Sequence, residues 1–401
     1  MGAGSGPVNQ GRHVMQNFVF ENPTRVIFGK GSIARIGQEL KRFGSKALLV
    51  YGSGSIKKNG VYDQVVASLK EARVPFVEFA GVRSNPYLSK VLEGIEVAKR
   101  EQTDVILAVG GGSVIDTAKT IACGVKADHD IWDFFTYKKS IGGALPVLTI
   151  LTISASASEM NPAAVITKEE TCQKFSIRSL FIQPKVSIMD PSVLSSLSDA
   201  YTAYSAADAI AHMLEGYFNN TEPAGILQDR LVESLMRTLM EATEACLRDP
   251  ADYNARANFM WAATLGFNGL TTAGMGNVRY PVHMIEHSLS AIYDVPHGAG
   301  LSIVLPAWMT WASRKNPAKF ARLAREVFGV KLKDDVRAAA RGISRLKAWF
   351  IAIKAPVRLR EVDIPARDIK KIAANAVMLA ETWRLTGYPE EVIADILKLC
   401  R

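Results

Sequence analysis

Hydrophobic residues in the first half of the chain occur as short runs that alternate with amphipathic stretches. The runs predict strands at residues 46–51, 75–79, 104–109, 145–150 and 185–191, and the stretches between them predict helices at 61–72, 88–100 and 113–122. Runs that are apolar at nearly every position are typical of strands buried on both faces of a parallel sheet. The pattern therefore predicts a doubly wound α/β unit that binds its ligand at the carboxyl ends of the strands.

After residue 197 the strand-like runs stop, and helical periodicity continues to the end of the chain. Helices are predicted at 199–218, 223–247, 253–270, 279–291, 300–314, 317–328, 333–351 and 366–399, the last interrupted near 387–389. A chain of 401 residues exceeds what one hydrophobic core normally serves. We expect an α/β dinucleotide-binding domain at 15–197, an all-α domain at 198–401 and a ligand cleft between them.

The composition is that of an ordinary globular protein, with 48% hydrophobic and 22% charged residues. The formal net charge is +9, but no Lys/Arg run interleaved with aromatic residues marks a nucleic-acid surface, so no nucleic-acid partner is expected. We interpret the excess as solvated surface charge that also helps to attract a phosphate-bearing cofactor. Four scattered cysteines without a CxxC pair favour a reduced, cytoplasmic compartment.

Two stretches bear on targeting and on membranes. Residues 1–14 are rich in Gly and Ser and lack an apolar core, so we expect a leader added before a natural start near Met15. The longest apolar stretch, 300–312, is too short to cross a bilayer and contains Pro306, so no membrane partner is expected.

Histidines cluster in this chain. Three of the six, His283, His287 and His297, fall close together, and His212 lies upstream. His283 and His287 are four residues apart on a predicted helix, so both rings leave one face, and Asp208 and His212 repeat that spacing on a second helix. A lone histidine on an apolar helix is usually a packed core residue. Two such pairs in a chain nearly free of histidine favour a site for a divalent metal ion.

Glycines follow the predicted strand at 104–109. Gly110, Gly111 and Gly112 lead directly into Ser113, where a helix is predicted to begin. Glycines at such a turn let backbone N–H groups approach a phosphate, and the helix N-terminus favours its charge. A glycine triplet also serves ordinary tight turns, and the GxGxxG fingerprint is absent. Its position between a buried strand and a helix nevertheless predicts phosphate binding.

Two further loops lie at the predicted carboxyl edge of the sheet. The hydroxyl-rich loop at 152–161 could bind ribose, phosphate or the nicotinamide amide, or could be a turn held by local side-chain bonds. The other loop, Gly52, Ser53, Gly54 and Ser55, precedes Lys57 and Lys58 and contains no acidic residue. Because an acidic residue there would bind the ribose hydroxyls of NAD and repel a 2′-phosphate, this loop favours NADP(H) over NAD(H), although small residues also tolerate NAD.

Taken together, these motifs resemble the iron-containing, group III alcohol dehydrogenases. The likeness rests on the strand and GGGSxxDxxK motif ending at Lys119, the hydroxyl-rich loop, the Asp208-x3-His212 pair and the His283-x3-His287-x9-His297 spacing. It covers the chain from residue 17 to 401 and is closest to the butanol dehydrogenase-like branch. The resemblance implies the dehydroquinate synthase-like fold, an α/β nucleotide domain followed by a helical metal domain, and a homodimer.

The resemblance also implies roles for individual residues. Asp208, His212, His283 and His297 would bind Fe²⁺ or Zn²⁺, and His287 would lie near the metal, facing the nicotinamide. The residues expected at the cofactor are Asn85, Gly110, Gly111, Gly112, Ser113, Asp116, Thr152, Ser156 and Lys174, in addition to the loop after Tyr51. This set predicts hydride transfer between NAD(P)(H) and a small alcohol or aldehyde, with His287 as a proton relay whose pKa lies near neutrality.

Other functions are compatible with parts of the pattern. His283-x-x-Glu286-His287 matches the H-x-x-E-H motif of inverted zinc peptidases, in which the Glu is the general base. A non-redox lyase of the same fold, a glycerol dehydrogenase-like relative and a non-catalytic metal-binding protein are further alternatives. Arg279 precedes His283 by four residues and would lie on the same helix face, where it could select an anionic, sulfo- or carboxy-substituted aldehyde.

Overall fold

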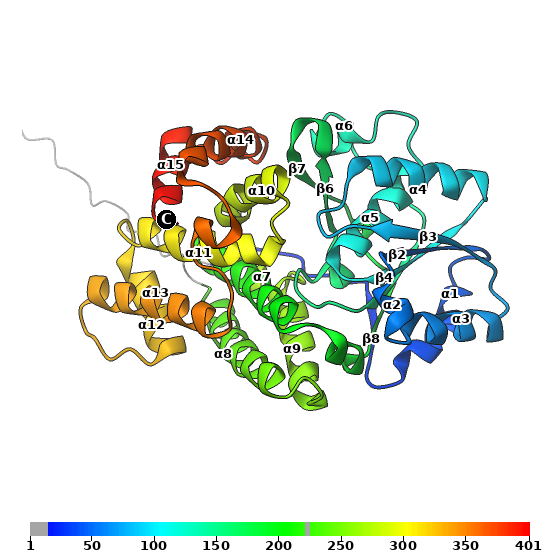
Figure 1. Ribbon diagram of the computed structural model, residues 1–401, viewed down its shortest axis with the longest axis horizontal. Coiled ribbons are helices and arrows are strands. Elements are labelled where there is room, and N and C mark those ends of the chain that lie inside the picture. Colours follow the sequence, from blue (N-terminus) through cyan, green and yellow to red (C-terminus); the bar gives the residue numbers. More distant parts are fainter. Residues whose placement is uncertain (1–14, 221–224) are drawn as a thin grey trace, which may run out of the picture.

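The α/β half of the molecule is built on a six-stranded parallel sheet (Figure 1). This computed structural model describes residues 15–220 and 225–401. In spatial order the strands are β1 (Arg25–Phe28), β8 (Val186–Met189), β5 (Val147–Leu151), β4 (Val105–Gly110), β2 (Ala47–Gly52) and β3 (Phe76–Val82). The predicted fold class is confirmed, and the five predicted strands are present. The short edge strand β1 was not predicted.

The sheet is covered by helices on both faces, which explains the continuous apolar runs. Every residue of β4 is buried, and β2 is buried up to its last residue. Figure 1 shows α4 (Leu88–Arg100) and α5 (Gly112–Gly124) on one side of the sheet, with α1 (Ile36–Leu40) and α3 (Val61–Glu71) on the other. Because the strands are parallel, their carboxyl ends share one edge, and this edge faces the helical half.

A two-stranded antiparallel hairpin was not predicted from the sequence. Its strands are β6 (Ala163–Lys168) and β7 (Gln173–Arg178). Buried and less buried positions alternate along only part of each strand, because each has two adjacent buried residues, so the period-two pattern of a half-exposed hairpin is weak in the sequence. In this register Thr167 lies opposite Lys174, and the backbone N–H of Thr167 donates to the carbonyl of Pro86 at 2.8 Å. The hairpin thereby brings Lys174 to the carboxyl edge of the sheet.

The second half is helical, as predicted. Its helices are α7 (Asp199–Phe218), α8 (Ile226–Arg248), α9 (Tyr253–Gly266), α10 (Pro281–Tyr293), α11 (His297–Ala312), α12 (Pro317–Phe328), α13 (Asp335–Ala352), α14 (Ile369–Thr382) and α15 (Glu390–Lys398). In the described part of the chain, none of the helices has both the length and the apolar character that crossing a membrane requires. The predicted leader at 1–14 and the predicted first residues of α8 at 223–224 lie outside the described residues.

Two helix starts differ from the predictions for clear reasons. Pro281 occupies the first turn of α10, where its missing N–H costs nothing, so the helix begins two residues later than expected and Arg279 lies outside it. Asp294 ends α10 in the left-handed conformation, with φ of 53°. The chain then turns through Pro296, so that α11 begins at His297 and not at residue 300 as predicted.

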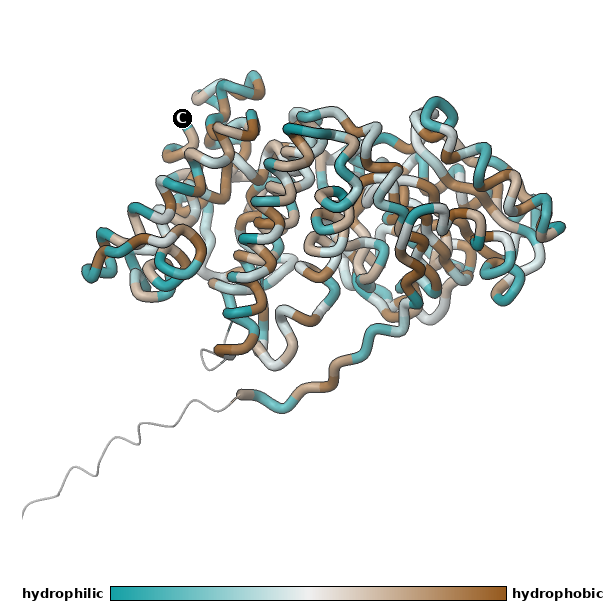
Figure 2. The backbone as a smooth tube through the Cα atoms, turned by 90° about the horizontal axis from the view of Figure 1, so that it is seen from below, coloured by the Kyte–Doolittle hydropathy of each residue, from teal (hydrophilic) through white to brown (hydrophobic). Residues whose placement is uncertain are grey.

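The N-terminal segment before β1 is extended and runs along the outside of the molecule (Figure 2). Asn22 anchors it, because its side-chain amide donates to the carbonyls of Met160 at 2.8 Å and Asn268 at 3.1 Å. Those acceptors belong to the two halves of the molecule. The segment therefore helps to fix the halves relative to each other.

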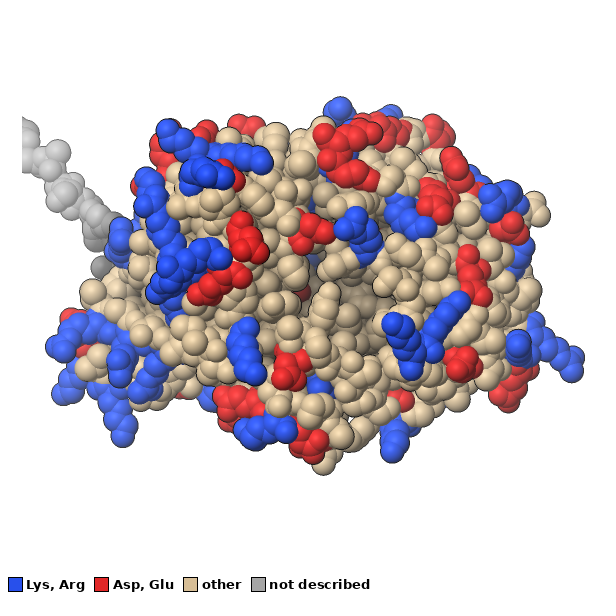
Figure 3. Space-filling model, in the orientation of Figure 1, with Lys and Arg blue, Asp and Glu red and all other residues tan. Residues whose placement is uncertain are grey.

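The positive charge is concentrated away from the sheet. Residues 314–347 contain eleven Lys and Arg against three Asp and Glu, a difference of +8, while the whole chain carries +9. Figure 3 shows these basic side chains over α12 and α13. Most of the net charge therefore lies on α12 and α13, and its contribution to attracting a phosphate-bearing cofactor stays a prediction.

The packing of α1 on α3 depends on Gly37. A Cβ at this position would lie 2.1 Å from the backbone oxygen of Ser68 and 2.7 Å from the Cβ of Ala72. We predict that Gly37→Ala lowers the free energy of unfolding by about 1–3 kcal/mol, because two backbones would have to separate. A lower urea midpoint checks this. Gly143→Ala, where nothing lies within 4 Å, is the control, and equal midpoints for the two variants would contradict the prediction.

Candidate active site

A cavity of about 610 Å³ lies between the carboxyl edge of the sheet and the helical half. It gathers nearly all residues that the sequence predicted at the cofactor and metal: Gly52, Ser53, Ser55, Asn85, Gly110, Gly111, Gly112, Ser113, Asp116, Thr152, Ser156, Lys174, Asp208, His212, His283, His287 and His297. Gly54 is the one predicted residue that does not line it. The fold thus brings into one space residues that lie as far apart in sequence as 52 and 297.

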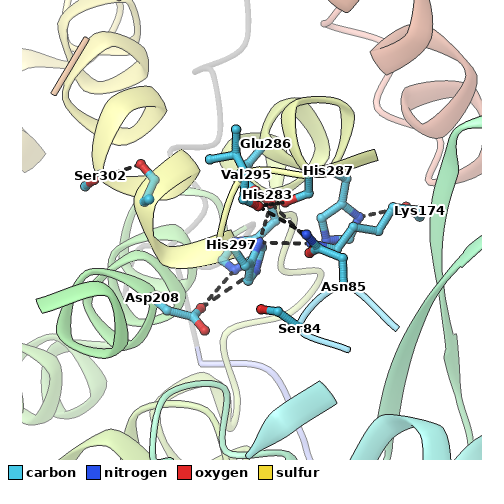
Figure 4. A network of polar contacts seen from close by, with 12 residues as sticks. Ser84, Asn85, Lys174, Asp208, His283, Glu286, His287, Val295, His297 and Ser302 are labelled. Atoms are coloured by element: carbon cyan, nitrogen blue, oxygen red, sulfur yellow. Dashed lines mark hydrogen bonds and ion pairs between the residues drawn. The ribbon is translucent and has the colours of Figure 1, made fainter. Parts of the chain in front are cut away.

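Three side chains of ligand type meet at one end of the cavity. Asp208 comes from α7, His283 from α10 and His297 from the first turn of α11 (Figure 4). Asp208 Oδ1 lies 3.7 Å from His283 Nε2 and 3.8 Å from His297 Nε2. The ligand atoms of all three residues lie within 4.8 Å of one another. We call Asp208, His283 and His297 the metal group.

The metal group contains buried polar atoms that lack a well-aligned hydrogen bond. Among the described residues this holds for Asp208 Oδ1 and His283 Nε2, although His212 Nδ1 lies 2.9 Å from the Asp208 oxygen. An unsatisfied buried polar atom costs about 1–3 kcal/mol, so this arrangement favours a bound ligand. Imidazole nitrogens and a carboxylate oxygen suit Zn²⁺ and Fe²⁺. The residues present therefore fit a divalent cation at this position.

His212 is the predicted metal ligand that the structure places differently. It lines the cavity, and its Nδ1 lies 2.9 Å from Asp208 Oδ1, but its ring nitrogens do not converge with those of His283 and His297. Its Nδ1–H donates to the carbonyl oxygen of Asp208 at 3.0 Å, and its ring packs on those of Phe267 and His283, with centroids 4.0 and 4.1 Å away. Burial and the neighbouring His283 lower the pKa of His212 to about 4. The ring is thus neutral, and its Nε2 carries a free lone pair for a ligand.

Each histidine of the metal group contacts a glutamate through its other nitrogen. His283 Nδ1 contacts Glu215 of α7, and His297 Nδ1 contacts Glu286 of α10. Both glutamates are fully buried. Burial alone would lower the pKa of His283, but the carboxylates of Glu215 and Asp208 outweigh it and raise this pKa to about 9. With both Nδ1 atoms engaged, the Nε2 atoms are the ones directed at Asp208.

The H-x-x-E-H motif does not form a peptidase site. The Glu286 carboxylate contacts His297 Nδ1 and accepts a hydrogen bond from Ser290 Oγ at 2.5 Å. The Glu286 side chain does not line the cavity. The rings of His283 and His287 lie 6.4 Å apart between centroids and do not share a group of converging ligand atoms. A glutamate engaged in this way is not placed to activate water, so the peptidase alternative is wrong.

His287 lies beside the metal group and faces the cavity. Its Nδ1–H donates to the backbone carbonyl of Lys174 at 2.8 Å, and its ring lies 5.6 Å from that of Trp383. Burial and the charges of Lys174 and His297 lower the pKa of His287 well below its ordinary value. The prediction of a pKa near neutrality is therefore wrong. His287 is a neutral imidazole whose Nε2 can accept a hydrogen bond.

The glycine turn forms the phosphate-sized part of the cavity wall. A Cβ would lie 2.5 Å from Val114 at Gly110, 2.8 Å from Ile153 at Gly111 and 2.5 Å from Ser156 Oγ at Gly112. No side chain fits at any of these positions, so the backbone itself faces the cavity. Helix α5 begins at Gly112, one residue before the predicted start. Its N-terminus at the turn suits an anionic group such as a pyrophosphate.

Asp116 and Lys119 hold the loop that follows β5. Asp116 accepts from Ser158 Oγ at 2.5 Å and from the backbone N–H of Val165 at 3.0 Å. Lys119 is fully buried and donates to the carbonyl oxygens of Asn161 at 2.8 Å and Ala163 at 2.7 Å. Burial raises the pKa of Asp116 and lowers that of Lys119 to about 8. These contacts give Asp116 a structural role, and its contact with a pyrophosphate stays a prediction.

Lys174 and Asn85 join the two halves at the side of the cavity. Lys174 Nζ donates to Asn85 Oδ1 at 3.1 Å, and Asn85 Nδ2 donates to Asp294 Oδ1 at 2.9 Å and to the carbonyl of Val295 at 3.2 Å. These bonds fix the turn that leads into His297 (Figure 4). Burial lowers the pKa of Lys174. Both predicted cofactor residues thus also support the metal group.

The remaining predicted cofactor residues lie along the sheet edge. Thr152 is tied to the glycine turn, because its backbone N–H donates to the carbonyl of Gly110 at 3.0 Å. Ser156 lies against Gly112, as described above. Gly54, with φ of 117°, forms the left-handed turn before the short helix α2 (Ser55–Lys58), which directs it away from the cavity.

Sequence reasoning missed several residues of this site. Glu215 follows His212 by three positions on the same helix, a spacing that places both on one face and could have identified it. Phe267, which stacks on His212, lies just beyond α9 and has no recognisable pattern. Lys119 ends the GGGSxxDxxK motif, but the sequence alone suggested no role for it.

Comparison with known proteins agrees with the arrangement of both halves. A model described as iron-containing alcohol dehydrogenase matches residues 23–191, and a model of the C-terminal part of the Fe-containing alcohol dehydrogenase family matches residues 202–400. The two matches cover most of the chain, one on each structural half.

Individual relatives agree with the family models. The chain is 40% identical to the probable NADH-dependent butanol dehydrogenase 1 of Bacillus subtilis, over 96% of this chain and 99% of that protein. It is 34% identical to the NADPH-dependent aldehyde reductase YqhD of Escherichia coli, over 88% of this chain and 91% of that protein. The crystal structure of NADH-dependent butanol dehydrogenase A from Thermotoga maritima superposes with a TM-score of 0.93 at 47% identity, covering 97% of this chain and all of that one. The chain belongs to the iron-containing alcohol dehydrogenase family.

Proposed function

We propose that this protein is a metal-dependent alcohol dehydrogenase and aldehyde reductase that transfers hydride between NAD(P)(H) and a small alcohol or aldehyde. One observation carries the proposal. The metal group, in which Asp208 Oδ1 and His283 Nε2 lack a well-aligned hydrogen bond, shares a single cavity with a glycine turn where no side chain fits and the backbone is open to a ligand. The relatives described above are named as dehydrogenases or reductases, which argues against the lyase alternative.

The two ends of the cavity have separate tasks. A divalent cation supplies a Lewis acid for the substrate oxygen, and a nicotinamide dinucleotide supplies or accepts the hydride. The metal would be held by Asp208, His283 and His297, with His212 as a fourth ligand. The turn at 110–112 would bind the pyrophosphate of the dinucleotide. Because both sets of residues line one cavity, substrate and nicotinamide would be brought together, which lowers the entropic part of the barrier.

We propose that His287, which lies beside the metal group, is the catalytic residue. Its Nδ1–H is held by the carbonyl of Lys174, so Nε2 is the free acceptor in the cavity. A neutral imidazole in this orientation can accept a hydrogen bond from a substrate hydroxyl or from the cofactor. A bound cation would act in the same direction as burial and keep this ring neutral.

The cavity suits an uncharged substrate. Arg279, considered for an anionic aldehyde, is exposed, lies before α10 and does not line the cavity. The two basic lining residues are engaged: Arg83 pairs with Asp294 at 3.0 Å, and Lys174 donates to Asn85. Among the described lining residues, neither the Arg nor the Lys side chain is thus without a hydrogen-bond or ion-pair partner, which a sulfonate or carboxylate would have to displace. We therefore propose short neutral aldehydes and alcohols as substrates.

We propose NADP(H) as the preferred dinucleotide. The loop at 52–55 contains no acid. Glu78, a carboxylate in contact with Tyr51 just before this loop, already accepts from Tyr51 at 2.5 Å, Tyr62 at 2.6 Å and Lys57 at 3.1 Å. It is therefore not free to bind ribose hydroxyls. The names of the relatives do not favour this choice uniformly, since those of 39–40% identity are named NADH-dependent and the reductase of 34% identity is named NADPH-dependent.

Removal of the metal should abolish hydride transfer. We predict that chelation or Asp208→Asn lowers the rate of NADPH oxidation with butanal about 10³-fold, because a bound cation contributes several kcal/mol to the barrier. Added Zn²⁺ or Fe²⁺ should restore the chelated wild type. Asp395→Asn, at an exposed ion pair on α15, is the control. A chelator-resistant rate would contradict the proposal, and metal-dependent turnover without a nicotinamide absorbance change would favour a lyase.

Introducing a carboxylate into the loop after β2 should reverse the dinucleotide preference. We predict that Ser53→Asp lowers kcat/KM for NADPH about tenfold more than for NADH, because it would repel the 2′-phosphate. Steady-state rates with each dinucleotide measure this. Ser53→Asn keeps the size without the charge and should leave the preference unchanged. Wild-type enzyme that already prefers NADH would show that the loop has been misinterpreted.

The lowered pKa of His287 predicts a flat region in the pH profile. The ring stays neutral from its ordinary value of 6.5 upward, so kcat should show no break from this residue between about pH 6.5 and 8.5. His287→Phe should lower kcat about 10- to 100-fold through loss of one hydrogen bond, whereas His287→Gln should retain most of it. An acidic limb near pH 6.5 that disappears in His287→Gln would contradict a neutral ring.

A further inference from the structure

Glu286 is the member of the H-x-x-E-H motif that the proposed function leaves without a task. It is fully buried, and its carboxylate contacts His297 Nδ1 and Ser290 Oγ (Figure 4). Ser290 Oγ also lies 3.0 Å from the carbonyl oxygen of Val295, in the turn before α11, so its single hydrogen can serve either acceptor. The carboxylate is therefore anchored within its own helix and directed at a residue eleven positions further on.

The surrounding helices leave a space for this carboxylate. A Cβ at Gly300 of α11 would lie 2.6 Å from Glu286 Oε1 and 2.7 Å from its Cγ. Any larger residue at position 300 would displace the glutamate. Helices α10 and α11 thus approach each other where the Glu286–His297 contact is made, and the absence of a side chain at Gly300 makes that contact possible.

Glu215 serves His283 in the same way from α7. Its carboxylate contacts His283 Nδ1, and it also accepts from the backbone N–H groups of Val282 at 2.5 Å and His283 at 3.3 Å. Those N–H groups belong to the first turn of α10, where they have no acceptor within the helix. Glu215 therefore fixes both the start of α10 and the ring that α10 presents.

Glu286 has one contact that Glu215 lacks. Lys174 Nζ lies 3.7 Å from Glu286 Oε2, and the same Nζ donates to Asn85 Oδ1. This chain of contacts connects the carboxyl edge of the sheet to His297. The ammonium group compensates the charge of Glu286, whereas Glu215 relies on helix N–H groups and His283.

We propose that Glu286 and Glu215 are positioning residues of the metal site, which fix the rings of His297 and His283 so that each Nε2 is directed at Asp208. The proposal rests on the proposed function, because it assigns these residues to the metal that the function requires. A carboxylate behind a ligating imidazole selects the tautomer, orients the ring and increases the basicity of the ligating nitrogen. Both rings approach Asp208 Oδ1 through Nε2, as this role requires.

The test is the affinity of the apoprotein for Zn²⁺, measured by competition with a chromophoric chelator, together with the visible spectrum of the Co²⁺-loaded protein. We expect Glu286→Gln and Glu215→Gln each to weaken Zn²⁺ binding 10- to 100-fold and to change the Co²⁺ bands. Glu159→Gln is the matched control, because Glu159 is equally buried and bonded to Thr264 Oγ1 at 2.6 Å without lining the cavity.

A double-mutant cycle separates positioning from a general loss of structure. In a His297→Ala background the ring that Glu286 orients is gone, so Glu286→Gln should change the Zn²⁺ affinity no further. An unchanged penalty in that background, or wild-type Zn²⁺ affinity in both single variants, would overturn the proposal. Failure of the wild type to bind Zn²⁺ or Fe²⁺ would overturn the proposed function itself, and the positioning role with it.

Discussion

A buried carboxylate that must find a partner of opposite charge is the constraint on which the site depends. Asp208 lies in the middle of α7 and is buried, so its charge requires partners nearby. Three histidines surround it, yet one carboxylate oxygen and one imidazole nitrogen have no well-aligned hydrogen bond in the described chain. Such an arrangement is costly as a structural element alone. It becomes favourable when a cation occupies the centre.

The fold serves this centre by bringing distant segments to a fixed distance. The parallel sheet places the loops after β2, β4 and β5 at one edge, and the hairpin β6–β7 carries Lys174 toward α10. The turn between α10 and α11 is held by Asn85 from the sheet side, so the position of His297 depends on both halves. Because both halves fix His297, the metal group and the cofactor-binding edge of the sheet can keep the separation that hydride transfer requires.

Much of this arrangement could be predicted from the sequence, and the failures have physical causes. Buried strands and amphipathic helices have distinct periods, so the α/β half and the helical half were evident, and the histidine spacing pointed to Asp208, His283 and His297. The strand β1 was missed because four residues give too short a pattern. The partners of Glu215 and Glu286 could not be foreseen, because a glutamate on a helix is usually solvated and only tertiary packing buries it. The pKa of His287 depends on burial and on Lys174, which no local pattern reveals.

The measurement that tests the account most directly is X-ray absorption spectroscopy at the metal edge of the purified, metal-loaded protein. The account predicts a first shell of nitrogen and oxygen at about 2.0–2.2 Å, with the outer-shell scattering of imidazole rings. Loss of one imidazole contribution in His283→Ala would locate the ion at the metal group. A shell of oxygen atoms without imidazole scattering, unchanged by that substitution, would place the metal elsewhere and contradict the central claim.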